Sequence, residues 1–217
     1  MKVKKLILGV YSVNSYIISL EKKAKSCFII DPGADFKSIA AYIAEENLHP
    51  EFILNTHGHF DHLGAAPEVI DKYRIPFYLH KDDESIAIDP EKNMSSLLGS
   101  NALSFKTYNL IDDDVLNLLE EHGINIYEMP GHTPGSIIIK IQGFLFTGDL
   151  LFRGGVGRTD LPGGSSKDLA SSLRKLKNFN PELIVSPGHG ATSSLEIEIS
   201  NNYYLSDDFL EGGINWF

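Results

Sequence analysis

The chain has 217 residues, of which 42% are hydrophobic and 22% are charged. This length and apolar content suffice for one large packed domain or two small ones, and they exclude a disordered or fibrous chain. No apolar run approaches the ~20 residues that a membrane-spanning helix needs. The net charge of −10 argues against a general nucleic-acid-binding protein, because phosphate contacts require clustered Lys and Arg.

The single cysteine, Cys27, excludes an internal disulfide. It lies in an apolar segment, where we expect it to be a small core residue. A chain without disulfides fits a reducing compartment. We therefore expect a cytoplasmic protein whose partner is a small molecule, with neither nucleic acid nor membrane among its partners.

Three strands are expected at the start of the chain, where segments rich in Val, Ile, Leu and Tyr alternate with turns. An amphipathic helix should follow at residues 36–47, with Asp35 as its N-cap. Next come a short buried strand at 52–54, a helix at about 65–74 and a strand at 76–80. The first three strands are expected at 3–9, 13–20 and 26–31.

Strand signals return in the second half of the chain, after a helix start near 82–84 and a long loop at 93–104. A helix capped by Ser165 or Ser166 should carry a stripe of leucines. The segment 195–205 fits either a strand or a helix. The strands of this half are expected at 115–119, 124–129, 136–141, 144–147 and 183–185.

Strands, a helix, more strands and another helix occur in this order roughly twice, around residues 1–75 and 115–190. No linker separates the two parts, so the sequence favours a single domain over residues 1–217. Two mixed β-sheets packed face to face, with helices outside, would accommodate this order.

The densest group of potential metal ligands lies in residues 56–62, THGHFDH. Imidazole and carboxylate groups are good ligands for Zn²⁺ and for relatives such as Fe and Mn. In an extended loop, His57, His59 and Asp61 would share one side, because alternate side chains point the same way. His62 would then face differently, which would suit two neighbouring metals. The alternative is a surface loop that contains three histidines by chance.

Three further polar residues follow apolar strands and lie in turns, where function usually concentrates. His132 lies in PGHTPG, Asp149 ends the segment FLFTG, and His189 lies in PGHG. Each alone could be a plain turn or surface residue, but together with the loop they favour one metal centre. Three other histidines are not part of such a group, namely His49, His80 and His122. We expect them to be ordinary surface or turn residues.

These motifs, in this order, resemble those of the metallo-β-lactamase-fold hydrolase superfamily: the THGHFDH loop, the PGHTPGS turn, the FTGD strand end and the SPGHG turn. Within it, the chain is most similar to the single-domain glyoxalase II-like branch, the hydroxyacylglutathione hydrolase-like enzymes, which share LFRGGVGRTDLPGG at 151–164. The resemblance implies an α+β fold, an αββα sandwich of two mixed β-sheets flanked by helices, with the metals at one edge.

The resemblance also implies two divalent metal ions, zinc in the first place, with iron or manganese as alternatives. Asp149 would bridge the ions, and Asp61 and Asp149 would be the catalytic residues. Because two divalent ions carry more charge than these two carboxylates, a metal-bridging hydroxide is electrostatically favoured, and metal binding lowers the pKa of water from ~15.7 towards ~7. The other ligands would be His57, His59 and His132 at the first metal, and Asp61, His62 and His189 at the second.

The expected reaction is hydrolysis of a thioester of the S-acylglutathione type. A thiol with a pKa near ~8.5 leaves as thiolate without a strong general acid. Arg158 could hold a substrate carboxylate in a two-point contact, or it could pair with Asp160 or Asp149 and fix the loop. Glyoxalase II itself has a Lys-Phe-Tyr stretch roughly where this chain has residues 158–160.

Two other functions stay open. A persulfide dioxygenase, whose group shares a Gly-Arg-Thr-Asp stretch, would hold one iron with His57, His132 and Asp149. A metal-free binding module would leave all seven ligands unexplained. Beside the ligands, Asn14 and Asp31 could support the metal loop through hydrogen bonds, although ordinary turn and strand roles are the simpler interpretation.

Overall fold

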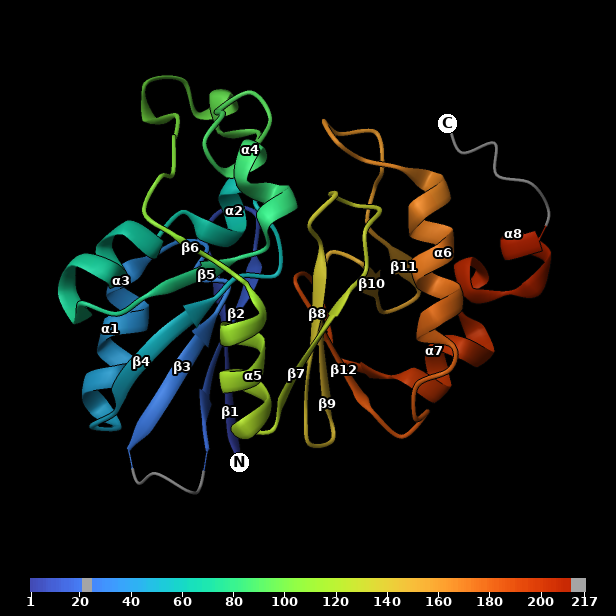
Figure 1. Ribbon diagram of the computed structural model, residues 1–217, viewed down its shortest axis with the longest axis horizontal. Helices are drawn as coiled ribbons and strands as arrows, with labels where there is room; N and C mark the ends of the chain where they lie inside the picture. Colours follow the sequence, from blue (N-terminus) through green and yellow to red (C-terminus); the bar gives the residue numbers. More distant parts are fainter. Residues whose placement is uncertain (21–24, 212–217) are drawn as a thin grey trace. The chain divides into compact units, whose positions relative to one another are not determined.

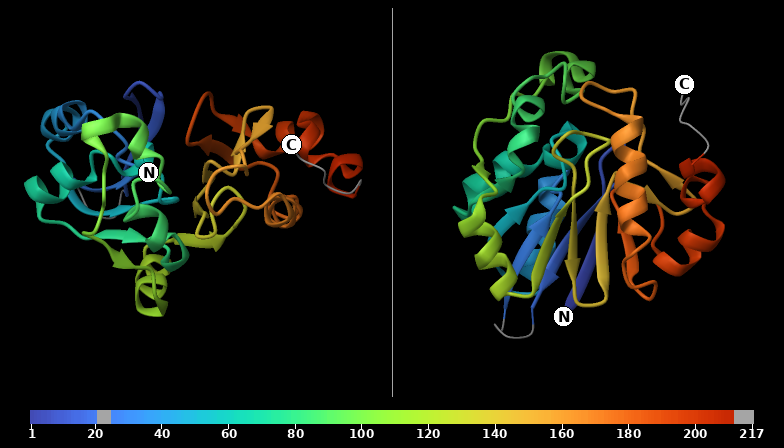
Figure 2. Two further views of the ribbon diagram at one scale, coloured as in Figure 1. Left: turned by 90° about the horizontal axis from the view of Figure 1, so that it is seen from above. Right: turned by 45° about the vertical axis from the view of Figure 1, so that its right-hand side comes forward.

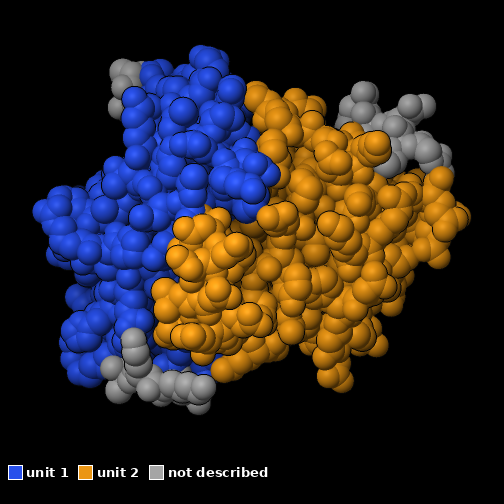
Figure 3. Space-filling model, in the orientation of Figure 1, with its two compact units in different colours: residues 1–110 blue, residues 111–217 orange. Residues whose placement is uncertain are grey.

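The computed structural model describes residues 1–20 and 25–211, and the chain divides into two compact units, residues 1–110 and 111–217 (Figures 1 and 3). Each unit contains one mixed β-sheet with helices beside it, so the predicted α+β class is confirmed. The single domain expected over 1–217 stays a prediction, and its last residues, 212–217, lie outside the described ranges.

The first unit is built on a six-stranded sheet whose strand order follows the chain. Its first three strands pair antiparallel and the following ones pair parallel. The strands are β1 (Lys2–Leu8), β2 (Val13–Ser19), β3 (Ser26–Ile30), β4 (His49–Leu54), β5 (Phe77–Leu79) and β6 (Asn109–Leu110). The strands predicted in this half of the chain are therefore confirmed, and β6 is an additional one.

Helices α1 (Phe36–Glu45) and α3 (Ala66–Tyr73) pack beside each other along the six-stranded sheet (Figure 1). Asp35 caps α1 by accepting a hydrogen bond from the Ser38 amide, as predicted. The apolar stripe of α1 and Val69 of α3 join the core formed by β2, β3 and β4. The other helical segments are α2 (Phe60–Leu63), η1 (Lys81–Asp83), α4 (Glu84–Ala87) and η2 (Ser95–Asn101).

The second unit contains a five-stranded sheet in the order β13-β12-β9-β8-β7. β12 pairs parallel with β9, and the other neighbours pair antiparallel. The turn predicted at Gln142-Gly143 joins β8 to β9. The strands are β7 (Ile124–Glu128), β8 (Ile137–Ile141), β9 (Phe144–Gly148), β12 (Ile184–Pro187) and β13 (Ser193–Ser194), beside a separate pair, β10 (Leu151–Phe152) and β11 (Gly155–Val156).

Helix α6 (Ser166–Leu176) lies alongside the strands of this second sheet (Figure 2). Ser165 caps it by accepting a hydrogen bond from the Asp168 amide at 3.2 Å. Its predicted leucine stripe is buried with residues of β8, β9 and β12 in one core. The other helical segments are α5 (Asp113–Glu121), α7 (Leu195–Asn201), η3 (Tyr203–Leu205) and α8 (Asp207–Glu211).

The strand expected at 115–119 is wrong, because these residues belong to α5. Asp112 caps the helix by accepting a hydrogen bond from the Val115 amide at 3.0 Å. Asp113 and Asp114 in the first turn interact favourably with the helix dipole. Local capping therefore outweighs the strand-like run of apolar residues. The ambiguous segment 195–205 forms α7 and η3.

None of the helices in the described ranges is long and apolar enough to cross a membrane.

Candidate metal centre

The loop after β4 gathers three buried imidazole rings in the first unit. The ring centroids of His57 and His59 lie 4.9 Å apart, and those of His57 and His62 lie 4.1 Å apart. Asp61 lies in the same segment and is partly buried. We call these four residues, His57, His59, Asp61 and His62, the histidine cluster. Buried imidazoles packed this closely, with a carboxylate beside them, are typical of metal sites.

The extended conformation expected for the whole loop is wrong from Phe60 onwards, because α2 begins there. The Phe60 amide donates to the carbonyl of Asn93 at 3.0 Å, and the His62 amide donates to the carbonyl of His59 at 3.1 Å. A helical turn, rather than strand alternation, therefore positions Asp61 and His62. The side-by-side grouping of His57, His59 and Asp61 that followed from an extended loop no longer applies, and the His62 ring lies against that of His57, with 4.1 Å between the centroids. The assignment of these residues as metal ligands stays a prediction.

Asp31 ties this loop to the end of β3. Its carboxylate accepts hydrogen bonds from the amide and the hydroxyl of Thr56, both at 2.7 Å. It also accepts one from Nδ1 of His62 at 2.9 Å. Because a carboxylate only accepts, Nδ1 carries the proton and Nε2 is the candidate ligand atom. The supporting role considered for Asp31 is thus confirmed. Asn14 is buried in β2, and its role stays a prediction.

A second buried carboxylate, that of Asp83, also holds the loop, and the sequence alone does not predict this role. Oδ2 of Asp83 accepts a hydrogen bond from the Gly58 amide at 2.7 Å. A Cβ on Gly58 would lie only 3.1 Å from the Asp83 carbonyl and 3.2 Å from the Ala87 amide. Glycine therefore permits this close approach. Asp83 lies in an acidic run that predicts a helix start, and nothing in its spacing connects it to residues 25 positions earlier.

In the second unit, Asp149 lies between two histidines. Its Oδ2 is 3.6 Å from Nε2 of His132 and 3.7 Å from Nε2 of His189. These separations are too long for good hydrogen bonds. They are close to the ~3.4 Å between two atoms bound to one tetrahedral zinc at ~2.05 Å each. The Asp149 cluster, defined as His132, Asp149 and His189, therefore fits a carboxylate that shares metals with both imidazoles.

Main-chain groups of the loop after β11 orient His132. The carbonyl oxygen of Arg158 lies 2.7 Å from its Nδ1, so Nδ1 donates and Nε2 is directed to Asp149. A Cβ on Gly157 would lie 1.8 Å from the Asp149 carbonyl oxygen and 3.2 Å from Nδ1 of His132. Only glycine allows this packing of loop, aspartate and imidazole.

The Arg158 side chain makes a two-point ion pair with Asp160. Its Nε and Nη2 each lie 2.6 Å from a carboxylate oxygen of Asp160. The hydrogen bonds from Arg158 lower the pKa of Asp160 to about 2. Of the two roles considered for this arginine, the structure shows the pair with Asp160. Contact with a substrate carboxylate stays a prediction.

The remaining histidines and the cysteine belong to neither cluster. His49 and His122 are exposed, as expected. His80 is a turn residue, one of the two roles expected for it, because it follows β5 and caps η1 by accepting a hydrogen bond from the Asp82 amide at its Nδ1. It is buried rather than on the surface. Cys27 is buried in β3, and burial raises the pKa of its thiol to about 12. It belongs to the hydrophobic core of the first unit, as predicted.

Each cluster supplies donors of the kind that hold a divalent ion, imidazole nitrogens with carboxylate oxygens. The donor types favour zinc or iron over magnesium or calcium, which prefer oxygen ligands.

Comparison with known proteins identifies the family of the chain. The family model of the metallo-beta-lactamase superfamily matches residues 8–189. The chain is 36% identical over 211 residues to the probable metallo-hydrolase YqgX of Bacillus subtilis, covering 95% of this chain and 98% of that protein. It is 33% identical over 188 residues to the hydroxyacylglutathione hydrolase GloC of Haemophilus influenzae, covering 84% and 88%. The crystal structure of BLEG-1 B3 metallo-beta-lactamase is similar with a TM-score of 0.85 and 32% identity, covering 94% of this chain and 100% of that one. The family resemblance and the fold class that it implied are confirmed.

Proposed function

Because the chain belongs to the metallo-beta-lactamase superfamily, we propose that it is a metal-dependent hydrolase of thioesters, of the hydroxyacylglutathione hydrolase-like kind. The observation that carries this proposal is the position of Asp149 between two imidazole Nε2 atoms. The similarity to a hydroxyacylglutathione hydrolase along most of both chains supports the substrate class.

We propose two divalent ions as cofactors, zinc before iron or manganese. When bound, such ions polarise a carbonyl group and lower the pKa of water towards ~7. Asp149 is the proposed bridging ligand, with Asp61 as the second carboxylate. The proposed imidazole ligands are His57, His59, His62, His132 and His189.

Hydrogen bonds within the chain orient two of the proposed imidazole ligands, His62 and His132. Asp31 holds the proton on Nδ1 of His62, and the Arg158 carbonyl does the same for His132. Both rings therefore present Nε2 in a fixed orientation, which reduces the reorganisation needed when an ion binds. The proposed centre consists of metal ligands and turn residues. A thiol with a pKa near ~8.5 suits it as the leaving group, because it departs as thiolate without protonation by a strong acid.

A small-molecule thioester is the proposed partner, and nucleic acid and membranes are not expected partners. The proposed location is the cytoplasm, which the single buried Cys27 supports.

A persulfide dioxygenase is the alternative candidate, favoured by the stretch Gly157-Arg158-Thr159-Asp160. It would use one iron held by His57, His132 and Asp149. Hydrolysis of a β-lactam is a further outcome to examine, since the BLEG-1 enzyme is similar over nearly the whole chain.

The deciding experiment is an activity panel on one purified batch whose metal content is measured. The panel contains S-lactoylglutathione, S-acetylglutathione, a chromogenic cephalosporin, and glutathione persulfide with oxygen uptake recorded. We expect thioester hydrolysis that disappears on chelation and returns with zinc. Oxygen uptake on the persulfide by iron-loaded protein, without thioester hydrolysis, would contradict the proposal.

A further inference from the structure

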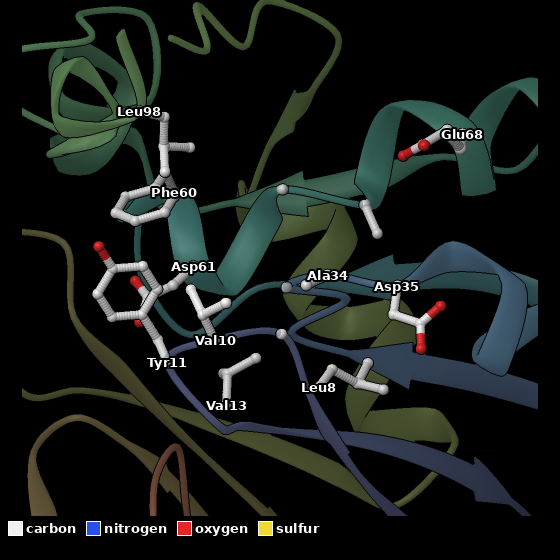
Figure 4. A pocket seen from close by; sticks show the side chains of 14 residues that line it. Leu8, Val10, Tyr11, Val13, Ala34, Asp35, Phe60, Asp61, Glu68 and Leu98 are labelled. Carbon is white, nitrogen blue, oxygen red and sulfur yellow. The ribbon is translucent and has the colours of Figure 1, made fainter. Parts of the chain in front are cut away.

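A pocket of about 270 Å³ opens within the first unit, and Asp61 of the histidine cluster forms part of its lining (Figure 4). The rest of the lining comes from the β1–β2 turn, the segment 33–35 after β3, α2 and the start of α3, with Leu98 of η2. The pocket therefore lies beside the proposed metal ligand Asp61, and none of its other lining residues is a proposed ligand.

The walls of this pocket are largely apolar and partly open to solvent. Val10 is 90% exposed and Tyr11 is 45% exposed. The Tyr11 ring meets that of Phe60 edge-on, with 5.2 Å between the centroids, and Leu98 lies on the other side of Phe60 (Figure 4). Exposed aliphatic and aromatic side chains that line one cavity are characteristic of a site for an apolar ligand.

Three carboxylates border the same pocket. Asp61 lies on the side of Tyr11, and Asp35 and Glu68 lie on the opposite side (Figure 4). Among the described residues that line the pocket there is no Lys, Arg or His. Asp35 is already engaged as the N-cap of α1, whereas Glu68 is exposed in the first turn of α3. A ligand carboxylate that reached this side would be repelled by Glu68, and because Glu68 is exposed, the repulsion is modest and weakens as the ionic strength rises.

The volume limits what can enter. Pockets for drug-sized ligands occupy roughly 300–1,000 Å³, so this one suits a short acyl group rather than an acyl group with its whole thiol carrier.

We propose that this pocket receives the acyl group of the substrate and selects an uncharged, apolar acyl chain over one that ends in a carboxylate. Glu68 is the specificity-determining residue. The inference rests on the proposed thioester hydrolysis and names the acyl class that the site takes.

The kinetic test compares S-butanoyl- and S-succinyl-N-acetylcysteamine, whose acyl chains have equal length and whose carrier has no charge. The metal-loaded enzyme should show kcat/KM at least ~10-fold higher for the butanoyl ester. Glu68→Gln should reduce this ratio by ~3-fold, because it removes the repulsion between Glu68 and the succinyl carboxylate. Glu68→Lys should reduce the ratio further, because the lysine attracts that carboxylate. Glu45→Gln and Glu45→Lys, on the exposed side of α1, are the matched controls and should leave the ratio unchanged.

A preference for the succinyl ester, or a ratio that Glu68→Gln and Glu68→Lys leave unchanged, would overturn the proposal. A binding experiment separates this failure from failure of the proposed function. Butyramide and succinamate are titrated into the protein while the methyl signals of Val10, Val13 and Leu98 are followed by NMR. Shifts with butyramide at lower concentrations than with succinamate support the pocket even if no thioester is hydrolysed. Equal shifts with both compounds, or shifts with neither, overturn it.

Discussion

The histidine cluster and the Asp149 cluster are held in place by different kinds of group. Buried carboxylates from distant segments, Asp31 and Asp83, fix the loop of the histidine cluster. In the Asp149 cluster, a main-chain carbonyl and the close approach of Gly157 orient His132. The first arrangement should therefore fail when a side chain loses its charge, and the second when a glycine gains a side chain.

The largest effect is expected from Asp149→Asn, which keeps the size of the side chain and removes the charge between His132 and His189. We expect loss of one or both metals and at least ~100-fold lower thioester turnover. Steady-state kinetics with metal analysis on the same sample would measure both. Asp208→Asn, an exposed substitution in the same unit, is the control. Full activity at full metal content would show that Asp149 is not the bridging ligand.

Asp31→Asn tests the side-chain support of the histidine cluster. An amide cannot accept all three hydrogen bonds that the carboxylate receives, so the orientation of His62 should relax. Loss of such a supporting group typically weakens metal affinity by ~10–100-fold. Competition with a zinc chelator would measure the change, with Asp71→Asn on α3 as the control. Unaltered affinity would mean that the loop keeps its geometry without this carboxylate.

Gly157→Ala tests the main-chain support of the Asp149 cluster. The added Cβ would meet the Asp149 carbonyl at 1.8 Å, so the loop must move away from His132. We expect ~10-fold lower metal affinity or turnover. Gly155→Ala is the matched control, because nothing lies within 4 Å of the Cβ it would add. Equal behaviour of the two variants would remove the role assigned to Gly157.

The proposed ligands could be recognised in the sequence because His57, His132, Asp149 and His189 each follow an apolar strand closely, while His59, Asp61 and His62 lie within five residues of His57. The helices α1 and α6 were predictable for a similar reason, since their caps, Asp35 and Ser165, act within three residues. Asp83 was not predictable, because its hydrogen bond spans 25 residues and depends on how two loops pack. The strand expected at 115–119 is wrong for a local reason. The apolar residues there form a strand-like pattern, but the capping signal at Asp112 favours the helix α5.

Arg158→Lys should have the most restricted effect, confined to substrates whose carrier has carboxylates, because the residue orients His132 through its carbonyl rather than its side chain. Metal content and hydrolysis of S-butanoyl-N-acetylcysteamine should be unchanged. For S-butanoylglutathione, whose carrier has carboxylates, KM should rise ~10-fold, equivalent to ~1.4 kcal/mol of lost binding. An equal loss with both substrates would indicate that the pair with Asp160 serves only to fix the loop.

The most direct test of the metal centre is the melting temperature of the purified protein before and after chelation, with metal content measured in both samples. Ligands drawn from four strand ends should link metal binding to folding, since an ion that binds only the folded chain stabilises it. We predict two ions per chain, a lower melting temperature after their removal, and recovery when zinc is restored. An unchanged melting temperature after verified removal of the metal would contradict this account.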